Sequence, residues 1–206
     1  MPEVWLFKRV RLRNWRNFTQ GDLPLGLRPF LVGPNASGKS NFLDVFCFLR
    51  DLAVSGGGLQ AALEKRGGMK AVPSLAARRD PTVLIEVEME RALPTHSDGQ
   101  RENWLYRIAF RERQLNHRRE RQVLVEEERV EKNGKALLRR PTAEDRADLL
   151  RLTQTHLEQV NMNKDFRLIA DFFASIRYFH IVPQLIREPE RSVGRKNDPY
   201  GGNCFC

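Results

Sequence analysis

The sequence carries one motif that restricts its possible folds more than any other feature, an eight-residue glycine loop. It reads Gly33-Pro34-Asn35-Ala36-Ser37-Gly38-Lys39-Ser40 and satisfies the pattern G-x-x-x-x-G-K-[ST]. The apolar run Pro29–Val32 comes directly before it, and apolar residues recur at helical spacing between Phe42 and Leu52. The loop is therefore expected to connect a strand to a helix in an α/β fold.

The residue types of this loop suit the binding of phosphate groups. Gly33 and Gly38 let the backbone curl without Cβ clashes, so that successive N–H groups point into one concavity. The helix that begins near Lys39 directs the positive end of its dipole at the same place. The Lys39 ammonium can reach the β- and γ-phosphates of a nucleotide, and the Ser40 hydroxyl can ligate Mg²⁺. The motif predicts a phosphate-binding loop.

Strand patterns occur on both sides of the loop. Residues 4–17 alternate, with Val10 and Leu12 on one face and Arg9 and Arg11 on the other, and residues 22–27 form a second extended piece. Between residues 83 and 131 the pattern is again strand-like, and Asn133-Gly134 is a hairpin signal. We therefore expect an antiparallel β insert, with strands at 83–89, at 104–110 and from 123 onward.

The remaining patterns indicate helices and one more strand. Thr142 can cap a helix from about Ala143 to Val160, a second helix is expected over Phe166–Ser175, and a final strand over Arg177–Val182. The chain then divides into four segments: 1–70 with the hairpin, loop and helix; 71–140 with the insert; 141–187 with the helices and the return strand; and 188–206, an irregular C-terminus that we expect to be truncated.

The hairpin and the loop together resemble the start of the RecF/SMC-like ATPases. Arg13-Asn14-Trp15-Arg16-Asn17-Phe18 is similar to the aromatic turn before the loop in that family, with Trp15 in the first aromatic slot as a mild departure. Asn35 and Asn41 flank the loop as in the family. The resemblance is strong over residues 1–52 and loose over 53–187. It implies a P-loop NTPase fold, the N-terminal lobe of an ABC-ATPase head, in a group that includes bacterial AAA family ATPases of DNA repair and phage defence.

The resemblance also implies which residues hold the cofactors ATP and Mg²⁺. Arg13 or Arg16 would lie near the nucleotide, with a solvated hairpin arginine as the open alternative for each. Gln184 follows the final strand, where the family carries a glutamine that senses Mg²⁺, and an ordinary loop residue is the alternative. The expected nucleotide-binding residues are Gly33, Pro34, Asn35, Ala36, Ser37, Gly38, Lys39, Ser40, Asn41 and Arg16, and the expected Mg²⁺ ligands are Ser40 and Gln184.

The motifs that this family uses for hydrolysis are not evident in the sequence. They are an apolar strand that ends in Asp-Glu and a signature loop of the Leu-Ser-x-Gly-x type. Glu86 and Glu88 lie in an edge-like strand, Glu126–Glu128 offer no aspartate, and both groups precede Gln184. We therefore assign no catalytic residue. We expect an ATP-binding N-terminal half with little or no hydrolysis of its own, partnered by a second ATPase head or by the C-terminal half.

The net charge leaves a second interpretation open. The sequence has 35 Lys and Arg against 26 Asp and Glu, a net charge of +9, which is compatible with DNA as a partner. In this alternative the chain is a non-enzymatic fragment or a basic nucleic-acid-binding module. Its Arg111–Arg121 run would follow a phosphate backbone, although a solvated turn explains the same run.

The sequence gives no sign of a membrane or secreted protein. No apolar run approaches the ~18 residues of a membrane span, and the N-terminus lacks the pattern of a signal peptide. Three cysteines without a C-x-x-C pair do not form a disulfide framework. We expect a cytoplasmic protein.

Overall fold

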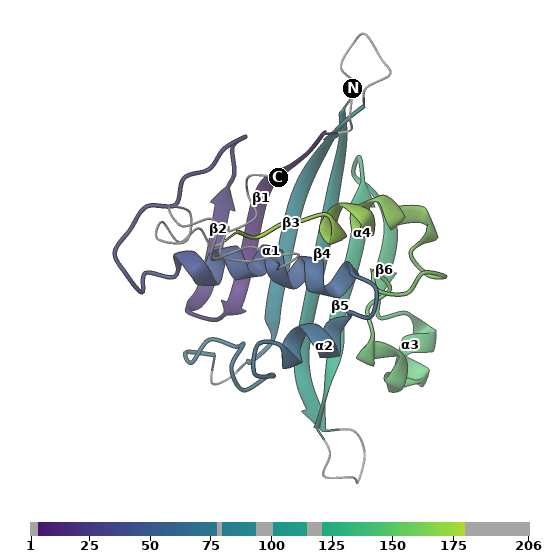
Figure 1. Ribbon diagram of the computed structural model, residues 1–206. Helices are drawn as coiled ribbons and strands as arrows, with labels where there is room; N and C mark the ends of the chain where they lie inside the picture. Colours follow the sequence, from purple (N-terminus) through teal and green to yellow (C-terminus); the bar gives the residue numbers. More distant parts are fainter. Residues whose placement is uncertain (1–3, 78–79, 94–100, 115–120, 180–206) are drawn as a thin grey trace, which may run out of the picture. The chain divides into compact units, whose positions relative to one another are not determined.

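The computed structural model describes residues 4–77, 80–93, 101–114 and 121–179, and its main feature is a six-stranded antiparallel sheet (Figure 1). Its strands, in spatial order, are β2 (Phe18–Pro24), β1 (Val4–Trp15), β3 (Val83–Ala92), β4 (Arg101–Gln114), β5 (Arg121–Lys132) and β6 (Lys135–Arg140). β1 pairs with β3 between Val4 and Arg13. The strands that were expected as an insert therefore continue the sheet that the N-terminal hairpin begins.

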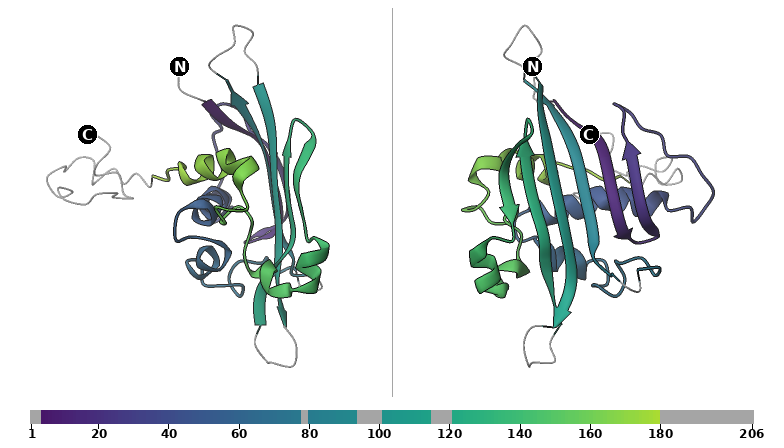
Figure 2. Two further views of the ribbon diagram at one scale, coloured as in Figure 1. Left: turned by 90° about the vertical axis from the view of Figure 1, so that its right-hand side faces the viewer. Right: turned by 180° about the vertical axis from the view of Figure 1, so that it is seen from behind.

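Helices cover one face of this sheet. The helices α1 (Lys39–Ala53), α2 (Leu59–Glu64) and α4 (Arg167–Ala174) lie on that face, and the opposite face is seen uncovered in the right-hand view of Figure 2. The other helical segments are α3 (Ala143–Ala147), η1 (Leu149–Thr153) and η2 (Lys164–Phe166). Residues 175–206 form a separate unit, whose described part, 175–179, holds no helix or strand. In the described ranges, every helix is too short or too polar to cross a membrane.

The core lies between the covered face of the sheet and α1. Val10 of β1 pairs in register with Val87 of β3, and both side chains are fully buried because alternate strand residues point toward the helices. Phe48 of α1 packs between Trp15 and Phe110, at ring-centroid distances of 5.2 and 5.5 Å. Truncating such a buried phenylalanine costs about 3–5 kcal/mol, so this contact holds α1 firmly over β1 and β4.

Most of the elements predicted between residues 39 and 140 are confirmed. α1 contains the apolar positions from Phe42 to Leu52, β3, β4 and β5 contain the three predicted strands, and Asn133-Gly134 forms the hairpin turn with φ angles of 49° and 78°. The structure also confirms the helix predicted over Phe166–Ser175 and the cap at Thr142, which forms a capping box with Asp145. The short helix α2 has no counterpart among the predicted elements.

The predicted strand Pro29–Val32 is wrong. The run is not in a strand, and Phe30 and Val32 are 87% and 93% exposed. An apolar run becomes a strand only where a neighbouring strand accepts and donates its backbone hydrogen bonds. None of the six strands in the described part of the chain pairs with this run.

The predicted helix Ala143–Val160 is also wrong beyond its first turns. Asp148 has φ −133° and ψ 95°, and its side chain accepts a hydrogen bond from the Leu150 N–H, which starts η1. Short polar side chains compete with the helical backbone in this way. Of the predicted strand Arg177–Val182, residues 177–179 are not in a strand, whereas 180–182 and Gln184 lie outside the described residues.

Candidate nucleotide-binding site

The glycine loop leads directly into α1, and its backbone conformation needs glycine at residue 38. Gly38 is the N-cap residue of α1, with φ 101°, and Ala36 also has a positive φ of 62°. A Cβ added to Gly38 would lie within 3.0 Å of Asn17 Cγ and closer still to both amide atoms of Asn17. Only glycine combines this φ with this close approach at no cost in strain.

The first turn of α1 fits an anion. The N-cap residue has no side chain, and the first turn, Lys39-Ser40-Asn41-Phe42, contains no carboxylate. The Phe42 N–H makes the first helical hydrogen bond, to Gly38 O at 2.8 Å, so the preceding amides are not used within the helix. These donors and the helix dipole meet where the sequence predicts the phosphate groups.

Lys39 lies across the loop. Its Nζ donates hydrogen bonds to Gly33 O at 2.8 Å and Pro34 O at 2.6 Å, and it is 3.4 Å from Ser37 Oγ. These acceptors are exposed loop groups, so a phosphate oxygen can take the place of either carbonyl without leaving a buried group unpaired. Ser40 is exposed at the second position of α1. The predicted cation and hydroxyl thus belong to the first two residues of α1, which directly follow the loop amides.

A hollow of about 300 Å³ opens beside the loop. The loop residues Gly33, Gly38 and Lys39 form part of it, and its other wall is apolar. That wall consists of Phe18, Leu23, Leu31, Val32 and Phe42. The hollow therefore joins an apolar surface, which suits a nucleoside, to the loop residues whose amides and lysine suit phosphate groups. Among the described residues, no carboxylate lines it.

The two arginines that the resemblance placed near the nucleotide have protein partners. Arg16 donates to Ala71 O at 2.9 Å and to Asp44 Oδ2 at 3.3 Å, and Arg13 pairs with Asp80 at 3.2 Å. Of the other predicted residues, Gln184 is outside the described ranges. The structure therefore brings together the loop, Lys39 and Ser40, and it holds Arg16 against α1 through Asp44.

One residue at this site has no role among the sequence predictions. Asn17 touches Gly38 and accepts a hydrogen bond from Asn41 Nδ2 at 2.8 Å. Its only signal in the sequence is its place in the turn that follows Trp15, because the contact depends on how the hairpin docks on α1.

The carboxylates that follow apolar strand segments are paired within the sheet. β3 is an interior strand, not the edge-like strand that was expected, and Glu86 is buried there. Glu86 accepts hydrogen bonds from Arg11 and from Arg107, the latter at 2.9 Å. Arg107 also pairs with Glu127 at 3.0 Å. These carboxylates neutralise arginines on neighbouring strands of the sheet, and they do not line the hollow beside the loop.

Arginines and glutamates alternate across the uncovered face of the sheet, which we call the charged face. Arg111 and Arg113 both pair with Glu126, at 2.9 and 2.6 Å. Arg121 pairs with Glu112 at 3.2 Å, on the side of the sheet that Phe110 faces, because Glu112 lies opposite Val123. Further pairs on the sheet include Arg9–Asp22, Arg11–Glu88, Arg107–Glu86, Arg107–Glu127 and Arg129–Glu131. The described ends of the Arg111–Arg121 run are therefore ion-paired, and its residues 115–120 lie outside the described ranges.

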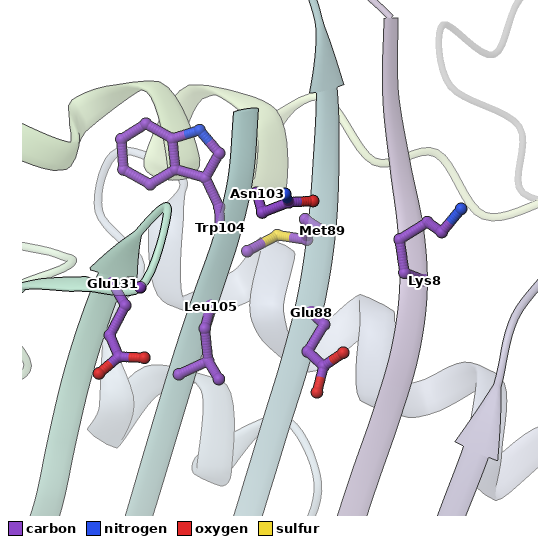
Figure 3. Close-up of a pocket in the computed structure, with 8 residues that line it drawn as sticks. Lys8, Glu88, Met89, Asn103, Trp104, Leu105 and Glu131 are labelled. Atoms are coloured by element: carbon purple, nitrogen blue, oxygen red, sulfur yellow. The ribbon is translucent and has the colours of Figure 1, made fainter. Parts of the chain in front are cut away.

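A second hollow, of about 330 Å³, spans β1, β3, β4 and β5 (Figure 3). Lys8, Glu88, Leu105 and Glu131 are among the side chains at its walls. Its acids already have cationic partners, because Glu88 pairs with Arg11 at 2.7 Å and Glu131 pairs with Arg129 and Arg139. This hollow belongs to the ion pairs of the sheet.

A buried charge cluster surrounds Arg140, at the edge of the sheet that β6 forms. Arg140 and Glu128 are fully buried and pair at 3.1 Å, and Arg140 also binds Asp145 at 3.0 Å. Burial raises the pKa of Glu128. Although burial opposes it, hydrogen bonds from Arg140 and Thr142 lower the pKa of Asp145. Burial and the Arg140 charge lower the pKa of His156 from 6.5 to about 4. The cluster ties β5 and β6 to the segment after α3.

The sequence matches a known protein family over most of its length. Residues 30–180 match the family described as "AAA domain, putative AbiEii toxin, Type IV TA system". No curated protein is significantly similar. The solved structures that resemble this chain include the recombination mediator protein RecF-ATP in the RecFOR pathway, at 17% identity and a TM-score of 0.36, over 66% of this chain. The chain corresponds to 29% of that protein's length. The family match contains the glycine loop, α1 and β3–β6.

Proposed function

Because this chain belongs to the AAA domain family matched by residues 30–180, a family of nucleotide-binding ATPases, we propose that it binds Mg·ATP at Gly33–Ser40. The predicted P-loop NTPase fold is confirmed by this membership, and the predicted RecF/SMC-like group of P-loop ATPases agrees with it. The observation that carries the proposal is the start of α1. There, backbone amides without a side-chain cap, the Lys39 side chain and the Ser40 side chain all belong to residues that directly follow a glycine with φ 101°.

The proposed roles follow from the donor groups of the loop. The loop amides from Asn35 to Lys39 would hold the phosphate oxygens, and the Lys39 ammonium would leave its carbonyl partners to bind the β- and γ-phosphates. The Ser40 hydroxyl would ligate Mg²⁺, whose charge offsets the repulsion between phosphate oxygens. Gln184 remains a proposed second ligand. The apolar wall around Phe18 and Phe42 would take the nucleoside.

Calorimetry of Mg·ATP binding tests this assignment, with the wild type, Lys39→Ala and Lys135→Ala. Lys135 is an exposed lysine on β6 and serves as the matched control. We expect binding by the wild type and by Lys135→Ala, and its loss in Lys39→Ala at unchanged thermal stability, since Lys39 binds only exposed loop groups. Equal affinity in Lys39→Ala, or no binding by the wild type, would overturn the proposal.

We further propose that this chain by itself hydrolyses ATP poorly or not at all. The support is that the hollow beside the loop has no carboxylate among its described lining residues, while Glu86 and Glu126–Glu128 are engaged in ion pairs or buried hydrogen bonds. A general base must lie within hydrogen-bond reach of the attacking water. Steady-state phosphate release by the wild type that is absent in Lys39→Ala would contradict this.

A second ATPase head, or a C-terminal half of the same ATPase, is the partner that we propose. The support is an exposed apolar surface beside the loop, in which Leu27, Phe30 and Val32 are 71%, 87% and 93% exposed. Large apolar side chains exposed together are typical of interaction surfaces. Sedimentation with and without Mg·ATP tests the first option, and a monomer at every concentration in both conditions would exclude self-association through this surface.

For the biological process we propose DNA repair or phage defence. The family description, which names a toxin of a type IV toxin–antitoxin system, favours defence. Survival after DNA damage and phage plating efficiency should differ between cells with the wild-type gene and cells with Lys39→Ala. Identical results in both assays would count against a role in either process.

A further inference from the structure

The turn between β1 and β2 touches the start of α1 through two hydrogen bonds. The Trp15 indole Nε1–H donates to Asn41 O at 2.8 Å. The Asn41 side chain in turn donates from Nδ2 to Asn17 Oδ1, also at 2.8 Å. Asn41 is therefore held by the turn at both its backbone and its side chain, one residue after Ser40.

Asn17 also limits the space around Gly38. Its amide group occupies the position where a Cβ of residue 38 would point, with Cγ, Oδ1 and Nδ2 all within 3.0 Å of that position. Asn17 is nevertheless exposed. An exposed side chain that is fixed by a hydrogen bond and packs against the N-cap of α1 does not serve to fill the core. It shapes the surface at which a ligand of the loop would lie.

The turn itself is anchored on its other side. The Arg16 N–H donates to Val72 O at 2.7 Å and the Ser74 N–H to Asn14 O at 3.0 Å, while Asn14 Nδ2 binds Asp80 O and Thr82 O. Asn14 and Arg16 both have positive φ angles, 55° and 52°. Asparagine adopts this conformation readily, whereas an arginine such as Arg16 seldom does so unless its surroundings favour it. The turn is thus a fixed support against which α1 begins.

We propose that Asn17 is a positioning residue of the nucleotide site, which rests on the proposed binding of Mg·ATP at the loop. Its amide oxygen accepts a hydrogen bond from the Asn41 side chain, and its amide group lies against Gly38. These two contacts keep the backbone amides of Lys39 and Ser40 in one orientation. The neutral amide matters at this place. A carboxylate would accept the same hydrogen bond from Asn41, but it would add a negative charge beside the phosphate groups.

The charge series of nucleotides tests this role. Binding of Mg·ATP, Mg·ADP and AMP is measured by calorimetry for the wild type, Asn17→Asp, Asn17→Ala and the control Gln20→Ala, an exposed residue of β2. We expect Asn17→Ala to weaken Mg·ATP binding about fivefold, because binding must then order the start of α1 without the hydrogen bond that holds Asn41 in the wild type. Asn17→Asp should weaken it about tenfold or more, and the loss should shrink from ATP to ADP to AMP as the ligand loses charge.

The thermal unfolding midpoints of the variants separate positioning from a structural role. Asn17→Asp should keep the wild-type midpoint, because the contact with Asn41 is retained. In the double variant Asn17→Ala, Asn41→Ala the loss of affinity should equal that of the weaker-binding single variant, because the two residues act through one hydrogen bond. If Asn17→Asp binds all three nucleotides like Gln20→Ala, the inference is overturned while the proposed function stands. If the wild type binds none of them, both are overturned.

Discussion

Replacement of Gly38 by alanine should weaken nucleotide binding strongly, because residue 38 has a positive φ and lies close to Asn17. An L-residue held near φ 101° carries a strain of about 1–2 kcal/mol. The new Cβ would also meet the Asn17 amide within 3.0 Å, so that Asn17 must move away and lose its hydrogen bond with Asn41, at a cost of about 1 kcal/mol. The free loop of the variant would relax to avoid these costs, and binding would have to restore the strained conformation. The sum, about 2–3 kcal/mol, then corresponds to about 30- to 150-fold weaker binding.

Calorimetry with Mg·ATP measures this effect, and the chain offers a matched control in Gly26→Ala. A Cβ at Gly26 meets no atom within 4 Å, and the backbone there lacks a positive φ. Gly26→Ala should therefore bind like the wild type. In the double variant Gly38→Ala, Asn17→Ala the Cβ contact is gone but the strain remains, so its affinity should be no lower than that of Gly38→Ala alone.

The reasoning fails if Gly38→Ala binds Mg·ATP within about twofold of Gly26→Ala. That result would mean that the loop adopts another backbone conformation when it binds, with residue 38 in a region open to alanine. If the free energy of unfolding of Gly38→Ala instead falls by the whole of about 2–3 kcal/mol, the substitution destabilises the fold and does not act through binding.

Three further predictions concern the sheet and its charges. Because the pKa of His156 is lowered in the folded chain, the unfolded chain takes up the proton first as the pH falls from 6.5 toward 4. The free energy of unfolding should therefore fall by up to about 1.4 kcal/mol per pH unit over this range. Urea unfolding of His156→Gln should show a smaller loss. Glu128→Ala should lower the free energy of unfolding by about 3–5 kcal/mol in chemical denaturation, because it leaves Arg140 partly unpaired in the interior. Glu127 is partly exposed, so Glu127→Ala should lower it by less than about 1 kcal/mol. Equal losses in the two variants would contradict this reasoning. Glu126→Gln removes the carboxylate that pairs with Arg111 and Arg113 and should increase binding of duplex DNA at low salt in a filter or anisotropy assay. Unchanged binding would show that these pairs do not limit it.

The loop and α1 are predictable from the sequence because their signals are local. The pattern of Gly33–Ser40 and the apolar spacing from Phe42 onward specify a turn and an amphipathic helix without reference to the rest of the chain. The hairpin at Asn133-Gly134 is predictable for the same reason, since the turn residues themselves adopt the positive φ angles.

The features that the sequence does not predict depend on contacts with distant segments. Pro29–Val32 has the composition of a buried strand, but composition does not supply a neighbour with which to pair. Glu86 resembles an edge residue until β1 and β4 are placed on either side of it, with their arginines toward its carboxylate. The contact of Asn17 with Gly38 joins residues 21 positions apart, and it exists only because the β1–β2 turn docks on α1.

The alternating pairs of the charged face have a consequence for any polyanion that approaches it. A basic protein surface usually gains binding free energy from nucleic acid because mobile counterions are released into the solvent. On this face the counterions of the arginines are glutamate side chains, which are attached to the chain and cannot diffuse away. A phosphate backbone would have to displace Glu126 or Glu86 from its arginines, and the displaced carboxylate would stay on the same surface and repel the phosphates. Despite the net charge of +9, we therefore expect the ion-paired arginines of this face to attract DNA less than the same number of unpaired arginines would.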